Sequence, residues 1–248
     1  PQVSILATSR ERLNQSGEVL YTLGGLAFPE EQSLEKPRNA LDYEAVTLLL
    51  QSARLARPGF ELTPGNLAAA VRICKLVQGM PLAIVLAGAW LESLSLEEIA
   101  DEIAQSLDFL EGEMRDLPER QRSIRAAFDY SWRRLAPEDQ HAFSKLTVFH
   151  GGFDRQAAQA VAGATLRTLR TLINKSFVTL NADERYEIHE LLRQYGLEKL
   201  TELASDTAVH TVHSQYYLDM IASLEDDLRG GRQLAALDEI DADLGNIR

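Results

Sequence analysis

The chain has 248 residues, 45% of them hydrophobic, which is enough to bury one large core or two to three smaller ones. No apolar run reaches the roughly 18 to 20 residues that a membrane-spanning helix needs, and the first residues do not resemble a targeting segment. The formal net charge of -12 argues against a general nucleic-acid binder. We expect a cytoplasmic protein in which the single cysteine, Cys74, is a small core residue.

The chain opens on a β-type run from Val3 to Thr8 that has no partner strand nearby in the sequence. We interpret this run as a strand cut from its parent sheet and expect the natural protein to extend upstream. A connecting segment marked by glycine and proline follows at residues 23–29. Residues 30–40 are polar and contain Pro37, a composition typical of a linker.

Helical periodicity dominates from residue 42 onward. A first helix is predicted over 42–56, and a second begins at Pro64 with Thr63 as its N-cap and stops at Gly79. The next runs from Pro81 to about Leu94 and is apolar on nearly all sides, so we expect it to be buried. A capping box at Ser95 opens the last helix of a compact bundle that covers residues 40–112.

The dipeptide Leu117-Pro118 marks a boundary, after which helices are expected near 120–133, 137–148, 154–161 and 165–174. Two short extended runs follow at 176–180 and 185–188, joined by a hairpin signal at 181–184. A long helix then runs from His189 to Leu203. Helices followed by a two-stranded wing are the winged-helix pattern.

The tail, residues 206–248, shows amphipathic helices split at Gly230-Gly231 and is compatible with the start of a helical repeat array. The predicted fold class is therefore mainly α: a helical bundle, a winged-helix domain and the start of a helical repeat tail.

Several of these segments, in this order, resemble signal-transduction ATPases with numerous domains, the STAND class that includes the NB-ARC or AP-ATPases, and most closely bacterial regulators of the AfsR or LuxR type. Residues 5–10 resemble the sensor strand, and 78–84 the GLPLA motif of the helical lid. Residues 117–131 resemble the beginning of the winged helix, which 149–153 and 172–178 continue. Residues 186–195 resemble the MHD motif, and 239–248 the beginning of a repeat domain.

The resemblance implies four parts. Residues 1–39 would be a remnant of the nucleotide-binding domain with its linker, 40–115 the lid, 116–204 the winged helix, and 205–248 a helical segment leading to a repeat domain. It implies ADP or ATP with Mg in the full-length parent, contacts with the upstream and downstream domains of the same protein, and a homo-oligomer on activation.

The sequence contains no G-x-x-x-x-G-K-[ST] loop and no apolar strand ending in Asp for Mg²⁺. The family places both upstream of the sensor strand. We therefore expect this segment to have no ATPase activity and to bind nucleotide weakly or not at all.

The resemblance also assigns site residues. Arg10 would contact the γ-phosphate, Pro81 would pack on the adenine ring with Gly79 allowing close backbone approach, and His189 would reach the β-phosphate of ADP and hold the resting state. Each has a plainer interpretation: a solvated arginine, a proline at a helix start with no ligand, and a hydrogen-bonded histidine at the edge of the core.

Two other functions stay open. Arg167, Arg170 and Lys175 lie on the helix that reads DNA in a DNA-binding winged helix, so the chain is alternatively a transcription regulator with a helical accessory domain. In the resembling family the winged helix is instead a regulatory lever. A bare helical interaction scaffold is the third possibility. His210 and His213 lie one helical turn apart without a third ligand, and we expect them on a helix surface rather than at a metal.

Overall fold

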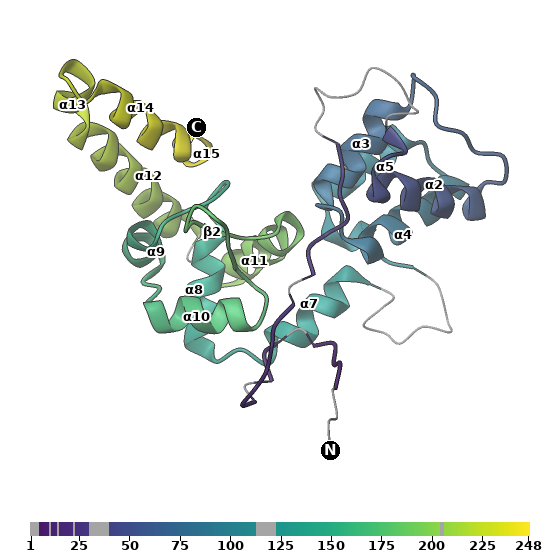
Figure 1. Cartoon of the computed structure of the whole chain (residues 1–248), viewed down its shortest axis with the longest axis horizontal. Helices are drawn as coiled ribbons and strands as arrows, with labels where there is room; N and C mark the ends of the chain where they lie inside the picture. Colours follow the sequence, from purple (N-terminus) through teal and green to yellow (C-terminus); the bar gives the residue numbers. More distant parts are fainter. Residues whose placement is uncertain are drawn as a thin grey trace. The chain divides into compact units, whose positions relative to one another are not determined.

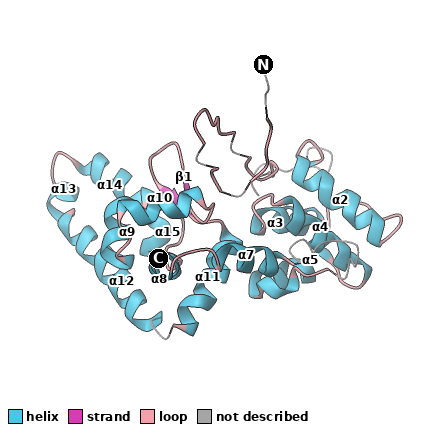
Figure 2. Cartoon of the chain, turned by 90° about the horizontal axis from the view of Figure 1, so that it is seen from below, coloured by secondary structure: helices cyan, strands magenta, loops and turns pink. Residues whose placement is uncertain are grey.

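The computed structural model describes residues 5–9, 11–13, 15–21, 23–29, 40–112, 123–203 and 206–248. In these residues it is mainly helical, with one two-stranded antiparallel sheet (Figures 1 and 2). The predicted class, a helical bundle with a winged-helix-like domain, is confirmed. None of the described helices combines the length and the apolar character that a membrane crossing requires. Packing divides the chain into two units, residues 22–134 and residues 1–21 with 135–248.

The first unit contains the helical bundle. Its helices are α2 (Glu44–Ala56), α3 (Leu67–Leu76), α4 (Pro81–Ala89), α5 (Leu96–Gln105) and α7 (Ile124–Trp132), with 3-10 turns η2 (Trp90–Glu92) and η3 (Leu107–Phe109). Helix α2 packs against α4, and α3 against α5. The fully buried core is aliphatic and includes Ile73, Ile84, Leu86, Leu91, Ile99 and Ile103. Cys74 is buried in this core, as predicted.

Helix α3 begins at Leu67, three residues later than the predicted start at Pro64. Residues 64–66 form a turn instead, because the side chain of Asn66 accepts a hydrogen bond from the Thr63 backbone N–H at 2.8 Å. Asn and Gly favour such turns, and here that preference prevails over the Thr-Pro helix-start signal.

Helix α4 ends at Ala89 rather than near Leu94, and residues 90–92 tighten into a 3-10 turn. The Trp90 ring stacks on Phe109 at 4.8 Å, and its indole N–H donates to the Phe109 carbonyl at 2.9 Å, which fixes this bend. The predicted capping box at Ser95 is confirmed, with hydrogen bonds in both directions between Ser95 and Glu98.

Helix α7 packs with the bundle. The Ile124 N–H donates to the Leu110 carbonyl at 3.2 Å, and Arg125 forms an ion pair with Asp108. The predicted domain boundary at 115/116 and the Leu117-Pro118 signal fall in or beside residues 113–122, which lie outside the described part of the chain. The division by packing falls later, between Arg134 and Leu135, so it groups α7 with the bundle.

The second unit contains the winged-helix elements in the predicted order. They are α8 (Pro137–Leu146), α9 (Arg155–Ala162), α10 (Leu166–Asn174), β1 (Thr179–Leu180), β2 (Tyr186–Glu187) and α11 (Glu190–Glu202). The strands pair Thr179 with Glu187 and Leu180 with Tyr186. The core of this unit is aromatic and includes Phe143, Phe149, Phe153, Phe177 and Tyr195, all fully buried.

Phe153 forms an isolated antiparallel β-bridge to the wing. It exchanges two backbone hydrogen bonds with Tyr186, at 2.9 and 2.8 Å. The hairpin turn predicted at 181–184 is confirmed, and the Asn181 side chain closes it by accepting hydrogen bonds from two backbone N–H groups. The wing backbone is therefore tied to the loop between α8 and α9.

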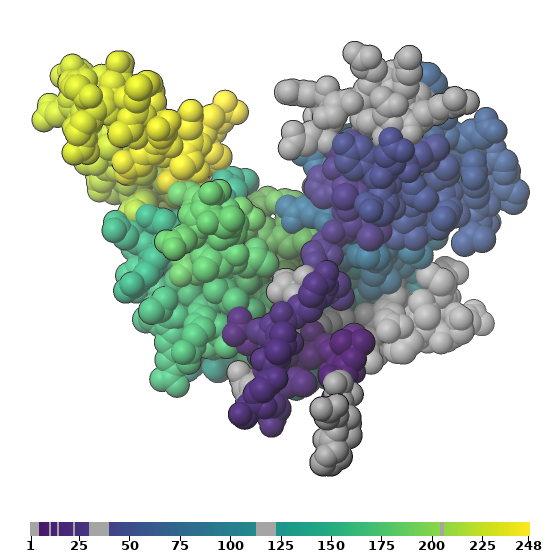
Figure 3. All heavy atoms as spheres, in the orientation of Figure 1, coloured from purple at the N-terminus to yellow at the C-terminus, as the bar shows by residue number. Residues whose placement is uncertain are grey.

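Four further helices complete the second unit: α12 (Asp206–Ser223), α13 (Glu225–Arg229), α14 (Gln233–Ala242) and α15 (Leu244–Ile247). The predicted split at Gly230-Gly231 is confirmed, and α12 packs against α9. Figure 3 shows these helices, in yellow, against the green and teal winged-helix elements. Residues 5–8 form no strand, and the side chains of Ile5 and Leu6 are almost fully exposed.

Candidate nucleotide-responsive site and its surroundings

The loop between α3 and α4 has an uncommon backbone. Gln78 and Gly79 both have positive φ angles, 45° and 67°, a region that side-chain-bearing residues rarely adopt. Pro81 follows as the first residue of α4, where its missing N–H costs nothing. Pro81 is exposed, whereas Gly79 is buried. The loop thus turns sharply and presents the proline ring at the start of a buried helix.

The backbone of residues 25–27 packs against this loop and holds it in place. The Leu26 N–H donates to the Gly79 carbonyl at 2.9 Å, and the Ala45 N–H, in α2, donates to the Ala27 carbonyl at 3.1 Å. A Cβ added to Gly79 would lie 2.0 Å from the Leu26 oxygen, and one added to Gly25 would lie 2.2 Å from the Gln78 oxygen. The two backbones therefore touch where neither has room for a side chain.

Arg10, the predicted γ-phosphate contact, lies outside the described residues. Its neighbours lie against the end of α10: the Arg12 N–H donates to the Asn174 carbonyl at 3.3 Å, and Glu11 pairs with Lys175 at 3.3 Å. Lys175, which we predicted on the same helix as Arg167 and Arg170, is the C-cap residue of α10 and is half-buried.

His189, the predicted β-phosphate contact, is the N-cap of α11. Its Nδ1 accepts a hydrogen bond from the Leu191 N–H at 3.2 Å, so in the neutral ring the proton lies on Nε2. A helix N-terminus attracts anions through its free N–H groups and its dipole. One turn along the helix, Arg193 is engaged by Glu190 through two hydrogen bonds of 2.8 Å.

The structure brings only some of the predicted site residues together. Gly79 and Pro81 adjoin in the first unit, whereas His189 belongs to the second. Arg167 and Arg170 are exposed on α10, opposite the buried Leu169 and Leu172. These two arginines therefore lie on the solvent side of the helix, and their contact with DNA stays a prediction.

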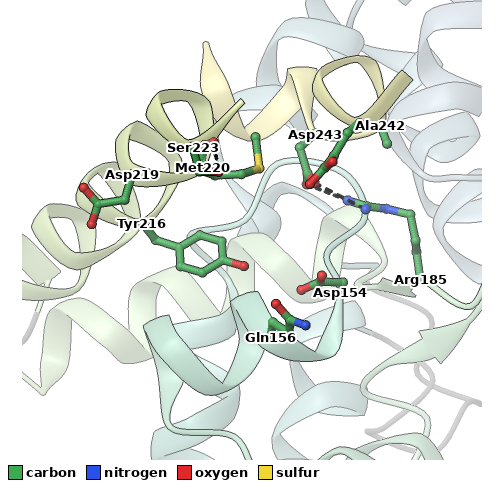
Figure 4. A pocket seen from close by; sticks show the side chains of 10 residues that line it. Asp154, Gln156, Arg185, Tyr216, Asp219, Met220, Ser223, Ala242 and Asp243 are labelled. Carbon is green, nitrogen blue, oxygen red and sulfur yellow. Dashed lines mark hydrogen bonds and ion pairs between the residues drawn. The ribbon is translucent and has the colours of Figure 1, made fainter. Parts of the chain in front are cut away.

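A cavity that sequence reasoning missed lies between the N-terminus of α9 and helices α12 and α14 (Figure 4). Its volume is about 390 Å³. Its charged lining consists of one guanidinium and four carboxylates: Arg185, Asp154, Asp219, Glu239 and Asp243. Burial, followed by the nearby carboxylates, raises the pKa of Tyr216, which also lines it. The sequence gives no sign of this cavity, because its members come from four separate segments.

The two tail histidines differ from each other. His210 is half-exposed and lies 3.1 Å from Asp206, as expected for a helix surface. His213 is buried, with its ring 5.1 Å from Phe149 and 4.9 Å from Tyr217, so our prediction of a surface position was wrong for it. Burial lowers the pKa of His213, and the neighbouring histidines lower it further. Among the described residues, no group of three or more His, Cys, Asp or Glu side chains is placed to hold a metal.

Known proteins resemble this chain along most of its length. Over 234 residues, 90% of the chain, it is 35% identical to a protein of Mycobacterium tuberculosis named "Putative HTH-type transcriptional regulator". Over 220 residues it is 29% identical to an uncharacterised protein of the same species. The chain spans about 25% of the first relative's length and about 53% of the second's. No family model matches the chain.

Proposed function

We propose that this chain is the lid and winged-helix portion of a STAND-class regulatory ATPase, in which the nucleotide state of the parent protein sets the conformation of these two parts. The observation that carries the proposal is the loop at Gln78–Pro81. It combines a left-handed backbone, a glycine packed too tightly to accept a side chain, and an exposed proline ring at the start of a buried helix.

Such a loop suits the face of a purine base. The proline ring is compact, apolar and already fixed in φ, so a base that packs on it costs little additional ordering. The rigid backing by Leu26 holds the ring in one place, since the Leu26–Gly79 hydrogen bond leaves the loop little freedom. Leu26 lies 16 residues after Arg10, the end of the sensor-like segment, so the loop and that segment are connected along the chain.

His189 would supply the second contact. With Nδ1 engaged by the start of α11, Nε2 is the nitrogen that carries the donating proton. A donor at a helix N-terminus suits a phosphate oxygen. In the ADP state we propose that this contact holds the winged helix closed, and that in the ATP state Arg10 meets the γ-phosphate while the His189 contact is lost.

The energies limit this mechanism. A change from 1:99 to 99:1 in a two-state equilibrium needs a differential affinity of about 5.5 kcal/mol. One charge-assisted hydrogen bond contributes about 1.5–3 kcal/mol. The His189 and Arg10 contacts together therefore approach the required range, and neither reaches it alone. Both are needed for a switch that is nearly complete.

The experiment uses the full-length parent protein. We expect a phosphate-binding loop upstream of this segment, and we expect the purified protein to release ADP and Mg²⁺ on denaturation. Pro81→Ala should weaken ADP binding about tenfold, whereas Pro137→Ala, which removes the same kind of helix-start proline from α8, should leave it unchanged. His189→Ala should shift the protein toward the oligomer without added ATP.

His141→Ala is the control for His189→Ala, because His141 is also a helix histidine with a local hydrogen bond, to the Pro137 carbonyl. Equal ADP affinity in Pro81→Ala and Pro137→Ala would reject the adenine contact. A parent sequence without any phosphate-binding loop would reject the ATPase itself.

The relatives favour a role in transcriptional regulation. This is the part of the proposal that rests on the comparison, since one relative is named as a regulator. This chain matches about a quarter of that protein, and the name does not say whether the helix-turn-helix lies in the matched part. We propose that regulation here is exercised through conformational change and assembly with the parent's other domains.

A DNA-binding winged helix is the second candidate, favoured by the exposed Arg167 and Arg170. Against it, the net charge is -12, and two further cations near the surface are engaged by carboxylates: Lys175 by Glu11 and the wing residue Arg185 by Asp243.

Fluorescence anisotropy with a labelled DNA duplex tests this candidate. DNA binding through α10 predicts a steep salt dependence, and it predicts that Arg167→Ala with Arg170→Ala lowers the slope by about two phosphate contacts. The control, Arg57→Ala with Arg155→Ala, removes two exposed arginines elsewhere and should leave the slope unchanged. Equal slopes in the two double variants would exclude α10 as the reading helix.

A further inference from the structure

A buried polar network joins the C-terminal helices to the wing. Its centre is Asp243, between α14 and α15, whose side chain is only 12% exposed. The Asp243 carboxylate accepts two hydrogen bonds from Arg185, at 2.5 and 3.3 Å, one from the Tyr217 hydroxyl at 3.1 Å and one from the Asn246 amide at 3.0 Å. Arg185 lies directly before β2, and Tyr217 lies on α12, so three separate segments meet at one carboxylate.

The protonation states in this network are fixed. Burial by itself would lower the pKa of Arg185, but the hydrogen bond and charge of Asp243 raise it above its ordinary value. Burial, followed by the charge of Asp243, raises the pKa of Tyr217. Arg185 therefore remains charged and Tyr217 remains a donor. Because a buried charge without its partner is costly, the members stabilise one another only when all are in place.

Asn246 connects the same network to the backbone of the loop between α8 and α9, which Phe153 joins to the wing. Its Oδ1 accepts from the His150 N–H at 2.8 Å, and its Nδ2 donates to the Gly152 carbonyl at 3.0 Å as well as to Asp243. The Gly152 carbonyl also accepts from Arg185 at 2.7 Å. An amide is the side chain that offers an acceptor on one side and two donor hydrogens on the other, and Asn246 uses both.

Gly245 allows this close approach. A Cβ added to it would lie 2.4 Å from the His150 carbonyl oxygen, too near for any side chain. The φ angle of Gly245 is not in the left-handed region, so the requirement for glycine here is one of space alone.

Aromatic packing supports the polar contacts. Phe149 stacks on Phe153 with ring centroids 4.5 Å apart, and Tyr217 packs edge-on against Phe149 at 6.3 Å. Phe153 pairs with Tyr186 in β2. The contacts of α12 therefore reach the wing through one continuous cluster.

We propose that residues 243–246 are a latch that locks helices α12–α15 to the wing, so that the wing and the C-terminal helices move as one body. Displacement of the C-terminal helices is then transmitted directly to β2, and β2 leads within two residues to His189 at the start of α11. The latch is a property of the second unit alone and does not depend on nucleotide binding.

The latch also engages a basic residue of the wing. Arg185, the basic residue beside β2, is held by two carboxylate contacts and the Gly152 carbonyl. Its side chain is 19% exposed. In this arrangement the basic side chain of the wing binds the C-terminal helices of its own chain.

Hydrogen–deuterium exchange of the 248-residue chain, read by peptide mass, tests the latch. Asn246→Asp keeps the side-chain shape. It replaces the amide nitrogen, which donates to the Gly152 carbonyl and to Asp243, with a carboxylate oxygen that cannot donate. Gly245→Ala places a methyl group against His150. In both variants exchange should rise at least about tenfold in two regions at once, residues 206–248 and the wing with its adjoining loop, residues 148–154 and 179–187, while residues 40–112 are unchanged.

The matched controls lie in the same C-terminal region, residues 206–248. Gly231→Ala adds a methyl where no atom lies within 4 Å, and Asp241→Asn changes an exposed carboxylate two residues from Asp243. Neither should alter exchange in either segment. A rise confined to residues 243–248, or no rise at all, would overturn the proposal, because the wing would then be independent of the C-terminal helices.

A milder variant keeps the test decisive if the first two fail to fold. Tyr217→Phe removes one hydroxyl donor and retains the ring that packs on Phe149. It should raise exchange about fivefold in both segments. A rise in α12 without one in residues 148–154 would count against the latch.

Discussion

Gly79→Ala should destabilise the helical bundle far more than its backbone strain alone explains. Gly79 and Gly59 both have positive φ angles, 67° and 84°, but only Gly79 is crowded: a Cβ there lies 2.0 Å from the Leu26 oxygen, whereas nothing lies within 4 Å of a Cβ on Gly59. Gly59→Ala therefore isolates the cost of the left-handed backbone, about 1–2 kcal/mol.

Gly79→Ala carries that same cost and two more. Forcing a methyl into the contact costs about 1–3 kcal/mol, and losing the Leu26–Gly79 hydrogen bond costs about 1 kcal/mol. The effect of alanine on the unfolded chain is the same in both variants and cancels. We therefore expect Gly79→Ala to be less stable than Gly59→Ala by about 2–4 kcal/mol.

Urea denaturation of the chain, with the fluorescence of Trp90 and Trp132 as the signal, measures this difference. Both tryptophans lie in the unit that contains the loop. Exchange at the Leu26 amide gives a local reading, and it should become fast in Gly79→Ala and stay slow in Gly59→Ala. Equal stability of the two variants, with the Leu26 amide protected in both, would refute the close-contact reasoning.

The neighbouring glycines give an independent check without backbone strain. Neither Gly24 nor Gly25 has a positive φ angle, yet a Cβ on Gly25 would lie 2.2 Å from the Gln78 oxygen and one on Gly24 would touch nothing. Gly25→Ala should release residues 25–27 from the loop, and Gly24→Ala should not.

Three further results are expected. Gly196→Ala, although favourable for helix propensity, should destabilise the second unit by about 1–3 kcal/mol in urea, because a Cβ there meets Thr147 and Phe143 at 2.4 and 2.8 Å; an unchanged midpoint would contradict this. Burial lowers the pKa of His213, so the folded protein favours the neutral ring, and the contribution of that ring to the free energy of unfolding is lost as pH falls below about 6.5. The melting temperature should therefore drop between pH 7.5 and 5.0, and it should drop less in His213→Phe. Burial raises the pKa of the Cys74 thiol to about 12, so iodoacetamide should label it only in urea, and rapid labelling of the native chain would show the core to be open.

Much of the local structure was predictable because it depends on neighbours along the chain. The capping box at Ser95 and the hairpin turn at 181–184 are set by residues within four positions of each other, and both are present as predicted. The winged-helix order followed from the alternation of helical periods with two short extended runs. Where local signals competed, as at Thr63 and Asn66, the sequence did not show which would prevail.

The contacts that join these elements to one another were decided by the tertiary structure. The Gly25–Gly79 contact joins residues 54 positions apart, and the Asn246–His150 bond joins residues 96 apart. A glycine or an asparagine looks the same in sequence whether it faces solvent or another backbone. Its role exists only after folding brings the partner near.

The tail histidines show the same limit. His210 and His213 are equivalent in sequence, one turn apart on one helix, yet His210 lies at the surface and His213 is buried against Phe149. The sequence alone determined that helices, a wing and a helical tail would form, because backbone hydrogen bonding and apolar periodicity are local. Which helix face was buried, and which polar groups met in the latch, depended on packing between distant segments, because burial is a property of the assembled core.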